Sequence, residues 1–187
     1  MLLYKTYRDK LRSMINMEKG YIQVYTGNGK GKTTAALGLC LRAICAGKKV
    51  FFGQFLKGQH YSELDAVKYL PNFHIEQFGG VCFVNENPKE EDIKDAQRGL
   101  QRMKEALVSK DYDIVVFDEI NIALYFKLIS VDEVLEVLSL KEDKTEVILT
   151  GRYAPDEIIQ IADLVTEMKE IKHYYNNGVS ARVGIEN

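Results

Sequence analysis

The feature that most constrains the fold is a glycine-rich run that lies between an apolar stretch and a helix-forming one. The apolar stretch covers residues 21–25, and the run after it reads Gly27-Asn28-Gly29-Lys30-Gly31-Lys32-Thr33-Thr34. Three glycines within five residues let the backbone turn so that successive N–H groups face the same phosphate oxygens. The helix that follows adds the positive end of its dipole. The run therefore predicts a strand, a phosphate-binding loop and a helix.

Two side chains at the end of this run have specific expected roles. Lys32 is expected to reach the β- and γ-phosphates of a nucleoside triphosphate, and the Thr33 hydroxyl to bind Mg²⁺. The usual pattern begins with glycine, whereas this chain has Thr26 at that position. A β-branched residue suits the end of a strand, and Gly27 and Gly29 supply the backbone freedom instead. The alternative, a glycine-rich turn that binds nothing, is disfavoured by the strand and helix on its two sides.

Length, charge and cysteine content bound the class of protein. A chain of 187 residues suits one domain, and a net charge of −2 gives no basic excess for nucleic-acid binding. Cys40, Cys45 and Cys82 lack the spacing of metal ligands and suit a reducing compartment. The sequence shows no secretion signal and no apolar segment of membrane-spanning length. We expect a cytoplasmic protein without nucleic-acid or membrane partners.

Apolar strand-like runs alternate with helical patterns along most of the chain. Strands are expected at 21–26, 50–55, 73–78, 114–117, 146–150 and 164–168. Helices are expected to begin at Asn87-Pro88, at the capping box of Ser130 and Glu133, and at Pro155. This alternation predicts a parallel sheet covered by helices on both faces. The fold class is α/β: one P-loop NTPase-like, three-layer sandwich over residues 20–187 with a mostly parallel central sheet.

A second group of polar residues follows the strand at 114–117. That strand ends in Asp118 and Glu119, and in P-loop proteins an acid at this place holds Mg²⁺ through water. Asp118 directly follows the apolar run and is the expected metal partner. Glu119 is expected to orient a water or to contact the nucleotide or the metal. The alternative is a helix N-cap followed by a first-turn acid.

The chain resembles the P-loop ATP:corrinoid adenosyltransferases from about Gly20 onward. An ordered series of motifs carries the resemblance: the loop at 25–36 with its non-glycine start, Gln54-Phe55-x-Lys57-Gly58, Phe117-Asp118-Glu119, Thr150-Gly151-Arg152, the segment 162–168, Lys172-His173, Gly178-Val179-x-Ala181 and Gly184-Ile185-Glu186. The resemblance implies transfer of the 5′-deoxyadenosyl group of ATP to the Co(I) of a corrinoid, with release of triphosphate. Mg²⁺ or Mn²⁺ is the implied metal. No protein nucleophile is needed, because Co(I) is the nucleophile.

The resemblance also assigns roles to individual residues. Residues 27–34 hold the triphosphate, and Asp118 and Glu119 serve the metal or the nucleotide. Arg152 contacts phosphate or the corrinoid, the alternative being a surface arginine after a strand. Gln54 and Lys57 contact the substrates at the same sheet edge, or else belong to a solvated loop. His173 faces the corrinoid or caps a loop.

Two further segments are assigned by the resemblance alone. Phe83 matches an aromatic residue that the family is thought to use to displace the lower axial ligand of cobalt, and its alternative is a plain core residue. Many members carry tryptophan two residues later, where this chain has Asn85. Residues 1–19 have the apolar spacing of an amphipathic helix, which is either a lid over the corrinoid or an ordinary docking helix or tail.

Several expectations concern partners and competing functions. The family implies a reducing flavoprotein such as flavodoxin and a homodimer. One alternative function is a P-loop ATPase or small-molecule kinase, which would release ADP with phosphate or a phosphorylated product. Another is a non-catalytic module that delivers ATP and corrinoid to a partner.

Overall fold

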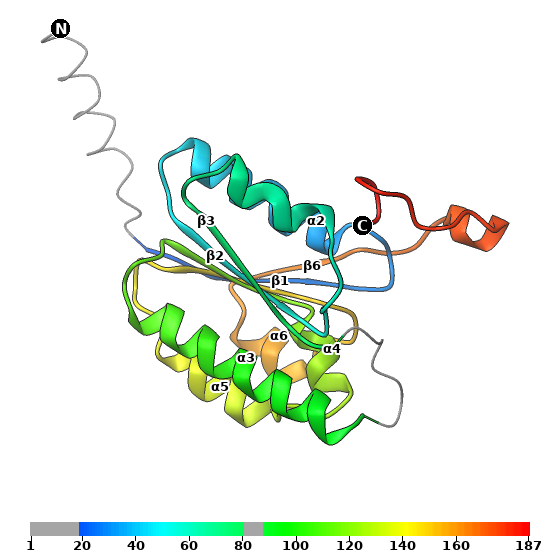
Figure 1. The fold of residues 1–187 in the computed structure, drawn as a ribbon. Coiled ribbons are helices and arrows are strands. Elements are labelled where there is room, and N and C mark those ends of the chain that lie inside the picture. Colours follow the sequence, from blue (N-terminus) through cyan, green and yellow to red (C-terminus); the bar gives the residue numbers. More distant parts are fainter. Residues whose placement is uncertain (1–18, 81–87) are drawn as a thin grey trace, which may run out of the picture.

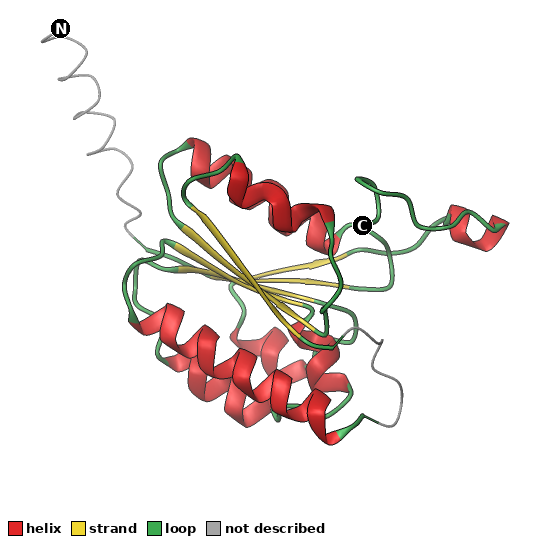
Figure 2. Ribbon diagram, in the orientation of Figure 1, coloured by secondary structure: helices red, strands yellow, loops and turns green. Residues whose placement is uncertain are grey.

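The fold is a parallel sheet with helices on both faces, as the sequence predicted (Figure 1 and Figure 2). The computed structural model describes residues 19–80 and 88–187. The sheet has six strands in the order β3-β2-β4-β5-β1-β6, and every pairing is parallel. The strands are β1 (Ile22–Thr26), β2 (Val50–Phe55), β3 (Phe73–Phe78), β4 (Ile114–Asp118), β5 (Glu146–Thr150) and β6 (Leu164–Glu167).

The helices form the outer two layers of the sandwich. One face of the sheet packs against α2 (Lys32–Cys45) and the short 3₁₀ helix η1 (Ser62–Lys68). The other face packs against α3 (Glu90–Val108), α4 (Ile120–Tyr125), α5 (Val131–Ser139) and α6 (Asp156–Ile161). A second 3₁₀ helix, η2 (Tyr174–Asn177), lies beyond β6 and away from the sheet (Figure 1). Within the described ranges, no helix combines the length and apolar character needed to cross a membrane.

The central strands β2, β4 and β5 are apolar over most of their length because both of their faces are covered. Successive side chains of a strand point to opposite faces, so neighbours join different cores. Phe51 belongs to the core under α3, and Phe52 to the core under α2; both are fully buried. This explains why β2 reads as a continuous apolar run instead of an alternating one.

The predicted helix starts are confirmed except for that of α3. Ser130 accepts a hydrogen bond from the Glu133 N–H, and the Glu133 carboxylate accepts one from the Ser130 N–H, which is the predicted capping box. The α3 helix begins at Glu90, two residues after the predicted first position at Pro88. Its start is fixed at Lys89, whose N–H donates to the Asp92 carboxylate.

The sheet brings the carboxyl ends of four strands to one edge. In the pairing of β2 with β4, Gln54 lies opposite Asp118. In the pairing of β1 with β5, Tyr25 lies opposite Thr150. The phosphate loop after β1 is therefore close to the residues that end β4 and β5. This is the edge at which α/β sheets bind their ligands.

Candidate active site

The predicted phosphate loop connects β1 to α2 and is anchored to the end of β6. Gly27 has φ 92° and Gly31 has φ 119°, values that only glycine adopts without strain. A Cβ atom at Gly27 would lie 2.5 Å from the Met168 carbonyl oxygen. The Gly29 N–H donates to that same carbonyl at 2.7 Å, so this amide anchors the loop and does not face a ligand. The expectation that successive loop amides converge on phosphate therefore needs correction at Gly29.

Lys32 lies across the loop that precedes it. Its ammonium donates to the carbonyl oxygens of Gly27 and Gly29, both at 2.7 Å. The residue is only 7% exposed, and this burial lowers the pKa of its amine. The two carbonyls hold the ammonium beside the pocket that the loop lines. This is where the lysine of a P-loop contacts phosphate.

Asp118 is the centre of a buried polar network. It is fully buried, and its two oxygens accept hydrogen bonds from four side chains, those of Thr33, Thr150, Gln54 and Lys57. One oxygen accepts from the hydroxyls of Thr33 at 2.9 Å and Thr150 at 2.7 Å. The other accepts from Lys57 at 2.9 Å and from Gln54 at 3.3 Å. Buried carboxylates are tolerated only when they are paired and hydrogen-bonded in this way.

The network argues against one of the two interpretations of Gln54 and Lys57, that of a solvated loop, and leaves their contact with the substrates a prediction. Gln54 is fully buried and its amide also donates to Glu63 at 2.9 Å. The side chain of Lys57 is 14% exposed and forms an ion pair with Asp118. Opposing burial, the Asp118 carboxylate raises the pKa of Lys57. Neither residue belongs to a solvated loop.

Glu119 occupies the N-cap position of α4 but its side chain does not cap the helix. Its backbone has φ 61°, and its N–H donates to the Thr150 hydroxyl at 2.9 Å. The carboxylate instead lines the pocket beside the phosphate loop. A non-glycine residue at positive φ is strained, and such strain is commonly found at functional sites.

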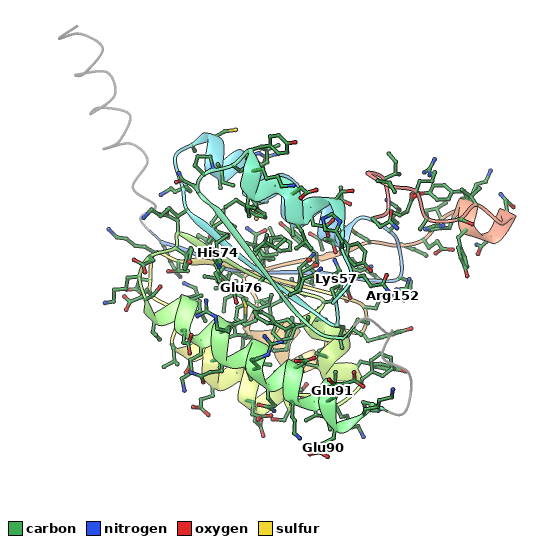
Figure 3. All side chains as sticks on the ribbon, in the orientation of Figure 1. Lys57, His74, Glu76, Glu90, Glu91 and Arg152 are labelled. Atoms are coloured by element: carbon green, nitrogen blue, oxygen red, sulfur yellow. The ribbon has the colours of Figure 1, made fainter. Side chains whose placement is uncertain are left out.

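The pocket has a volume of about 520 Å³ and gathers most of the predicted site residues. Its lining includes Asn28, Gly29, Lys30, Gly31, Lys32, Thr33, Thr34, Lys57, Glu119, Arg152 and His173. Gln54 and Asp118 lie beneath it in the buried network. Figure 3 places Lys57 and Arg152 at the same edge of the sheet. Phe83, Asn85 and residues 1–18 lie outside the described residues, so their expected roles stay predictions.

His173 lines the pocket and also caps the short helix η2. Its ring lines the pocket, and its Nδ1 accepts a hydrogen bond from the Tyr175 N–H at 3.1 Å, which caps η2. The ring also packs against that of Tyr174, with centroids 4.8 Å apart. The capping role is therefore observed, and the predicted contact with the corrinoid stays a prediction.

The structure adds residues that sequence reasoning missed. Thr150 belongs to the network, although the sequence analysis gave its motif and assigned no role to it. Two walls of the pocket come from residues 61–63 and 184–187. The second wall is held by Lys30, which donates to the Ile185 carbonyl at 3.1 Å, and by Ser62, which donates to the Asn187 carbonyl at 2.9 Å. No local pattern in the sequence indicates these contacts, because the partners are more than 100 residues apart.

The donors beside the phosphate loop fit a magnesium or manganese ion. The Thr33 hydroxyl and an Asp118 oxygen lie 2.9 Å apart, and the Glu119 carboxylate faces the same pocket. In the part of the chain that the structure describes, no three His, Cys, Asp or Glu side chains cluster as a metal cage. Mg²⁺ characteristically takes one or two protein carboxylates and completes its shell with water and substrate phosphates. The donor set fits that mode of binding.

The environment of Glu119 leads to a prediction for stability. Burial, and then the Asp118 carboxylate, raise the pKa of Glu119, so ionising this side chain costs more free energy in the folded protein than in the unfolded one. A raised pKa stabilises the fold at low pH, and this advantage is lost as pH rises through the folded-state pKa. We expect Glu119→Gln, which is always neutral, to raise Tm by about 2–4 °C at about pH 8, the shift for about 1 kcal/mol. Calorimetry should find a much smaller difference at about pH 4, below the ordinary pKa of a glutamate. Equal Tm values at both pH values would contradict this account.

Comparison with known proteins places these features in a family. A family model described as ATP:corrinoid adenosyltransferase BtuR/CobO/CobP matches residues 18–187. A corrinoid adenosyltransferase of Sinorhizobium sp is 37% identical, and the match covers 97% of this chain and 87% of that protein. A corrinoid adenosyltransferase of Escherichia coli (strain K12) is 35% identical, with 90% and 86% covered.

Comparison with solved structures concerns the fold. The crystal structure of the RadB recombinase superposes with a TM-score of 0.52 at 15% identity, covering 83% of this chain and 77% of that one. At this identity the likeness shows a shared architecture and carries no functional assignment. The predicted P-loop NTPase-like fold is thereby confirmed.

Proposed function

The chain belongs to the ATP:corrinoid adenosyltransferase family, and on this premise we propose that it transfers the 5′-deoxyadenosyl group of ATP to the Co(I) of a corrinoid. The cobalt electron pair forms the cobalt–carbon bond, and the C5′–O bond breaks so that its electron pair leaves with inorganic triphosphate. The observation that carries the proposal is that the phosphate loop, Glu119 and Arg152 line one pocket, with the Asp118 network beneath it.

The residues of the pocket suit a reaction in which a triphosphate is the leaving group. Negative charge grows on the α-phosphate oxygen as the C5′–O bond breaks, and fixed cations nearby stabilise it. Lys32 is the fixed cation, because two carbonyls hold it over the loop, and Arg152 is an exposed side chain that lines the same pocket. Thr33, Asp118 and Glu119 would hold Mg²⁺ or Mn²⁺, which would offset further triphosphate charge.

Nothing in this scheme requires a protein base. Cobalt is the nucleophile and no proton is transferred, so the protein contributes binding and orientation. This agrees with a site composed of phosphate-binding and charge-balancing groups. The raised pKa of Glu119 need not serve proton transfer in this reaction.

Several finer features are part of the proposal. The acceptor is cobalamin or a precursor such as cob(I)yrinic acid a,c-diamide, and a reduced flavoprotein such as flavodoxin supplies the electron. The protein acts in the cytoplasm as a homodimer, in adenosylcobalamin biosynthesis or salvage. Phe83 and His173 are assigned to the corrinoid side of the site.

Residues 1–19 are assigned to a lid over the corrinoid on the basis of their amphipathic spacing. Removal of residues 1–16 should raise the KM for the corrinoid and leave the folded core intact. Steady-state kinetics with varied corrinoid, alongside circular dichroism, measure the two effects separately. Unchanged kinetics in the shortened protein would contradict the lid.

The products of the reaction test the proposed function against its alternative. The protein is incubated with ATP, Mg²⁺ and chemically reduced cob(I)alamin without oxygen, and phosphorus NMR identifies the phosphate products. Inorganic triphosphate is expected. ADP, with either phosphate or a phosphorylated product, would instead identify a P-loop ATPase or kinase.

A further inference from the structure

We infer that Lys57 acts as a built-in counter-cation for Asp118, which keeps a divalent cation from binding tightly until the nucleotide brings its own negative charge. The inference rests on the proposed function, because it concerns the same ATP and metal site. Lys57 is a charge-balancing residue in this account and need not touch the reacting atoms.

The contacts of Lys57 are those of a cation held by acids. Its ammonium lies 2.9 Å from Asp118 and 3.6 Å from Glu63, and 5.0 Å from the centre of the Tyr61 ring. The Asp118 oxygen that it contacts is not the one that accepts from Thr33. The lysine thus balances the charge of the carboxylate through one oxygen, and the other oxygen keeps its hydrogen bond from Thr33.

The backbone around Lys57 keeps it in this position. The preceding residue, Leu56, has φ 60°, a conformation that side chains rarely adopt. A Cβ atom at Gly58 would lie 2.3 Å from the Gly79 carbonyl oxygen, so two chain segments are in direct backbone contact. A Cβ atom at Gly79 would lie 2.8 Å from the backbone nitrogen of Lys57 itself. These close backbone contacts restrict the conformation of residues 56–58, in which the Lys57 side chain points toward Asp118.

The charges in and beneath the pocket are balanced. The cations are Lys32, Lys57 and Arg152, and the carboxylates are Glu63, Asp118 and Glu119. At the rim, Lys30 lies 3.8 Å from Glu186 and adds one charge of each sign. A divalent cation approaching Thr33 and Asp118 alone therefore meets no excess of negative charge, and it is repelled by the nearby ammonium. ATP adds several negative charges, so the metal is expected to enter with the nucleotide.

The inference is tested by metal affinity in the absence of nucleotide. Free Mn²⁺ is followed by electron paramagnetic resonance during titration of the whole protein. Lys57→Gln removes the charge but keeps an amide donor for Asp118, and we expect it to bind Mn²⁺ about tenfold more tightly or better. Lys57→Arg keeps the charge and should bind Mn²⁺ as weakly as the parent protein. If Lys57→Gln does not fold, Lys57→Met, which also removes the charge, replaces it in the same titration.

A matched control separates this effect from a general change in charge. Lys48 has the same side-chain exposure as Lys57, 14%, and pairs with Asp113 at 3.3 Å just before β2, at the opposite edge of the sheet. Lys48→Gln should leave the Mn²⁺ affinity unchanged. The inference would be overturned if Lys57→Gln bound Mn²⁺ with an affinity within twofold of the parent's. It would also be overturned if Lys57→Arg or Lys48→Gln increased the Mn²⁺ affinity as much as Lys57→Gln does. The proposed function is tested separately, by identifying the phosphate products that the parent protein forms from ATP. That assay contains ATP, so its result does not depend on how tightly Mn²⁺ binds without nucleotide.

Discussion

Lys32→Met is expected to lower kcat/KM by about 10³-fold, because it removes a cation fixed over the leaving triphosphate. The ammonium is held by two backbone carbonyls, those of Gly27 and Gly29, so its position does not depend on contacts with other side chains. Methionine keeps the length and the apolar contacts of the lysine stem. Steady-state kinetics with both substrates varied should show a loss in kcat as well as in ATP binding.

Lys30→Met provides the comparison for this prediction. Lys30 lies in the same loop, but its ammonium donates to the Ile185 carbonyl at the pocket rim. Its replacement should cost much less than that of Lys32. If the two variants lost activity equally, the loss would reflect the charge of the loop as a whole, and the specific role of Lys32 would be wrong.

Asp118→Asn is expected to affect stability and activity together. The substitution keeps the shape but removes the charge that pairs with Lys57, and an amide cannot accept from all four of its present donors. Removing one partner of a buried ion pair costs about 3 kcal/mol, and we expect the free energy of unfolding to fall by that amount. Activity should fall by about 10²-fold, since Asp118 accepts a hydrogen bond from Thr33 and, in the proposed function, would position the metal. Denaturant unfolding and steady-state kinetics measure the two effects.

Asp113→Asn is the matched control for the stability effect. Asp113 also pairs with a lysine, Lys48, but its side chain is 37% exposed. Exposed ion pairs contribute about 0–1 kcal/mol, so this variant should unfold almost like the parent protein. Equal losses in the two variants would contradict the argument that burial makes the Asp118 network costly to break.

Local sequence patterns predicted the sheet well because most of its strands are short, largely apolar runs separated by polar segments. All six strands were found near their predicted positions. The α3 start was missed because proline is a common first residue of a helix, whereas here the Asp92 carboxylate fixes the start at Lys89. The short helix η1 was not predicted, since seven residues carry little periodicity, and the start of α4 appeared only as the alternative interpretation of Asp118 and Glu119.

The site was predictable where a motif encodes its chemistry and less so where it depends on strand order. The loop with Lys32 and Thr33, and the acids after β4, follow from local patterns. The contact of Gln54 with Asp118 exists because β2 lies beside β4, an adjacency that no local pattern specifies. The same holds for Thr150, which reaches Asp118 from the neighbouring strand β5. The wall formed by residues 184–187 depends on contacts still farther apart in sequence.

The most direct test of the central claim follows the carbon atom that is transferred. ATP with a heavy-carbon label at C5′ is incubated anaerobically with cob(I)alamin, Mg²⁺ and the protein, and the corrinoid is analysed by mass spectrometry and absorption spectroscopy. We predict a light-sensitive adenosylated corrinoid that carries the label, formed in equal amount to the inorganic triphosphate released. An unlabelled, spectrally unchanged corrinoid accompanied by ADP and phosphate would contradict the account.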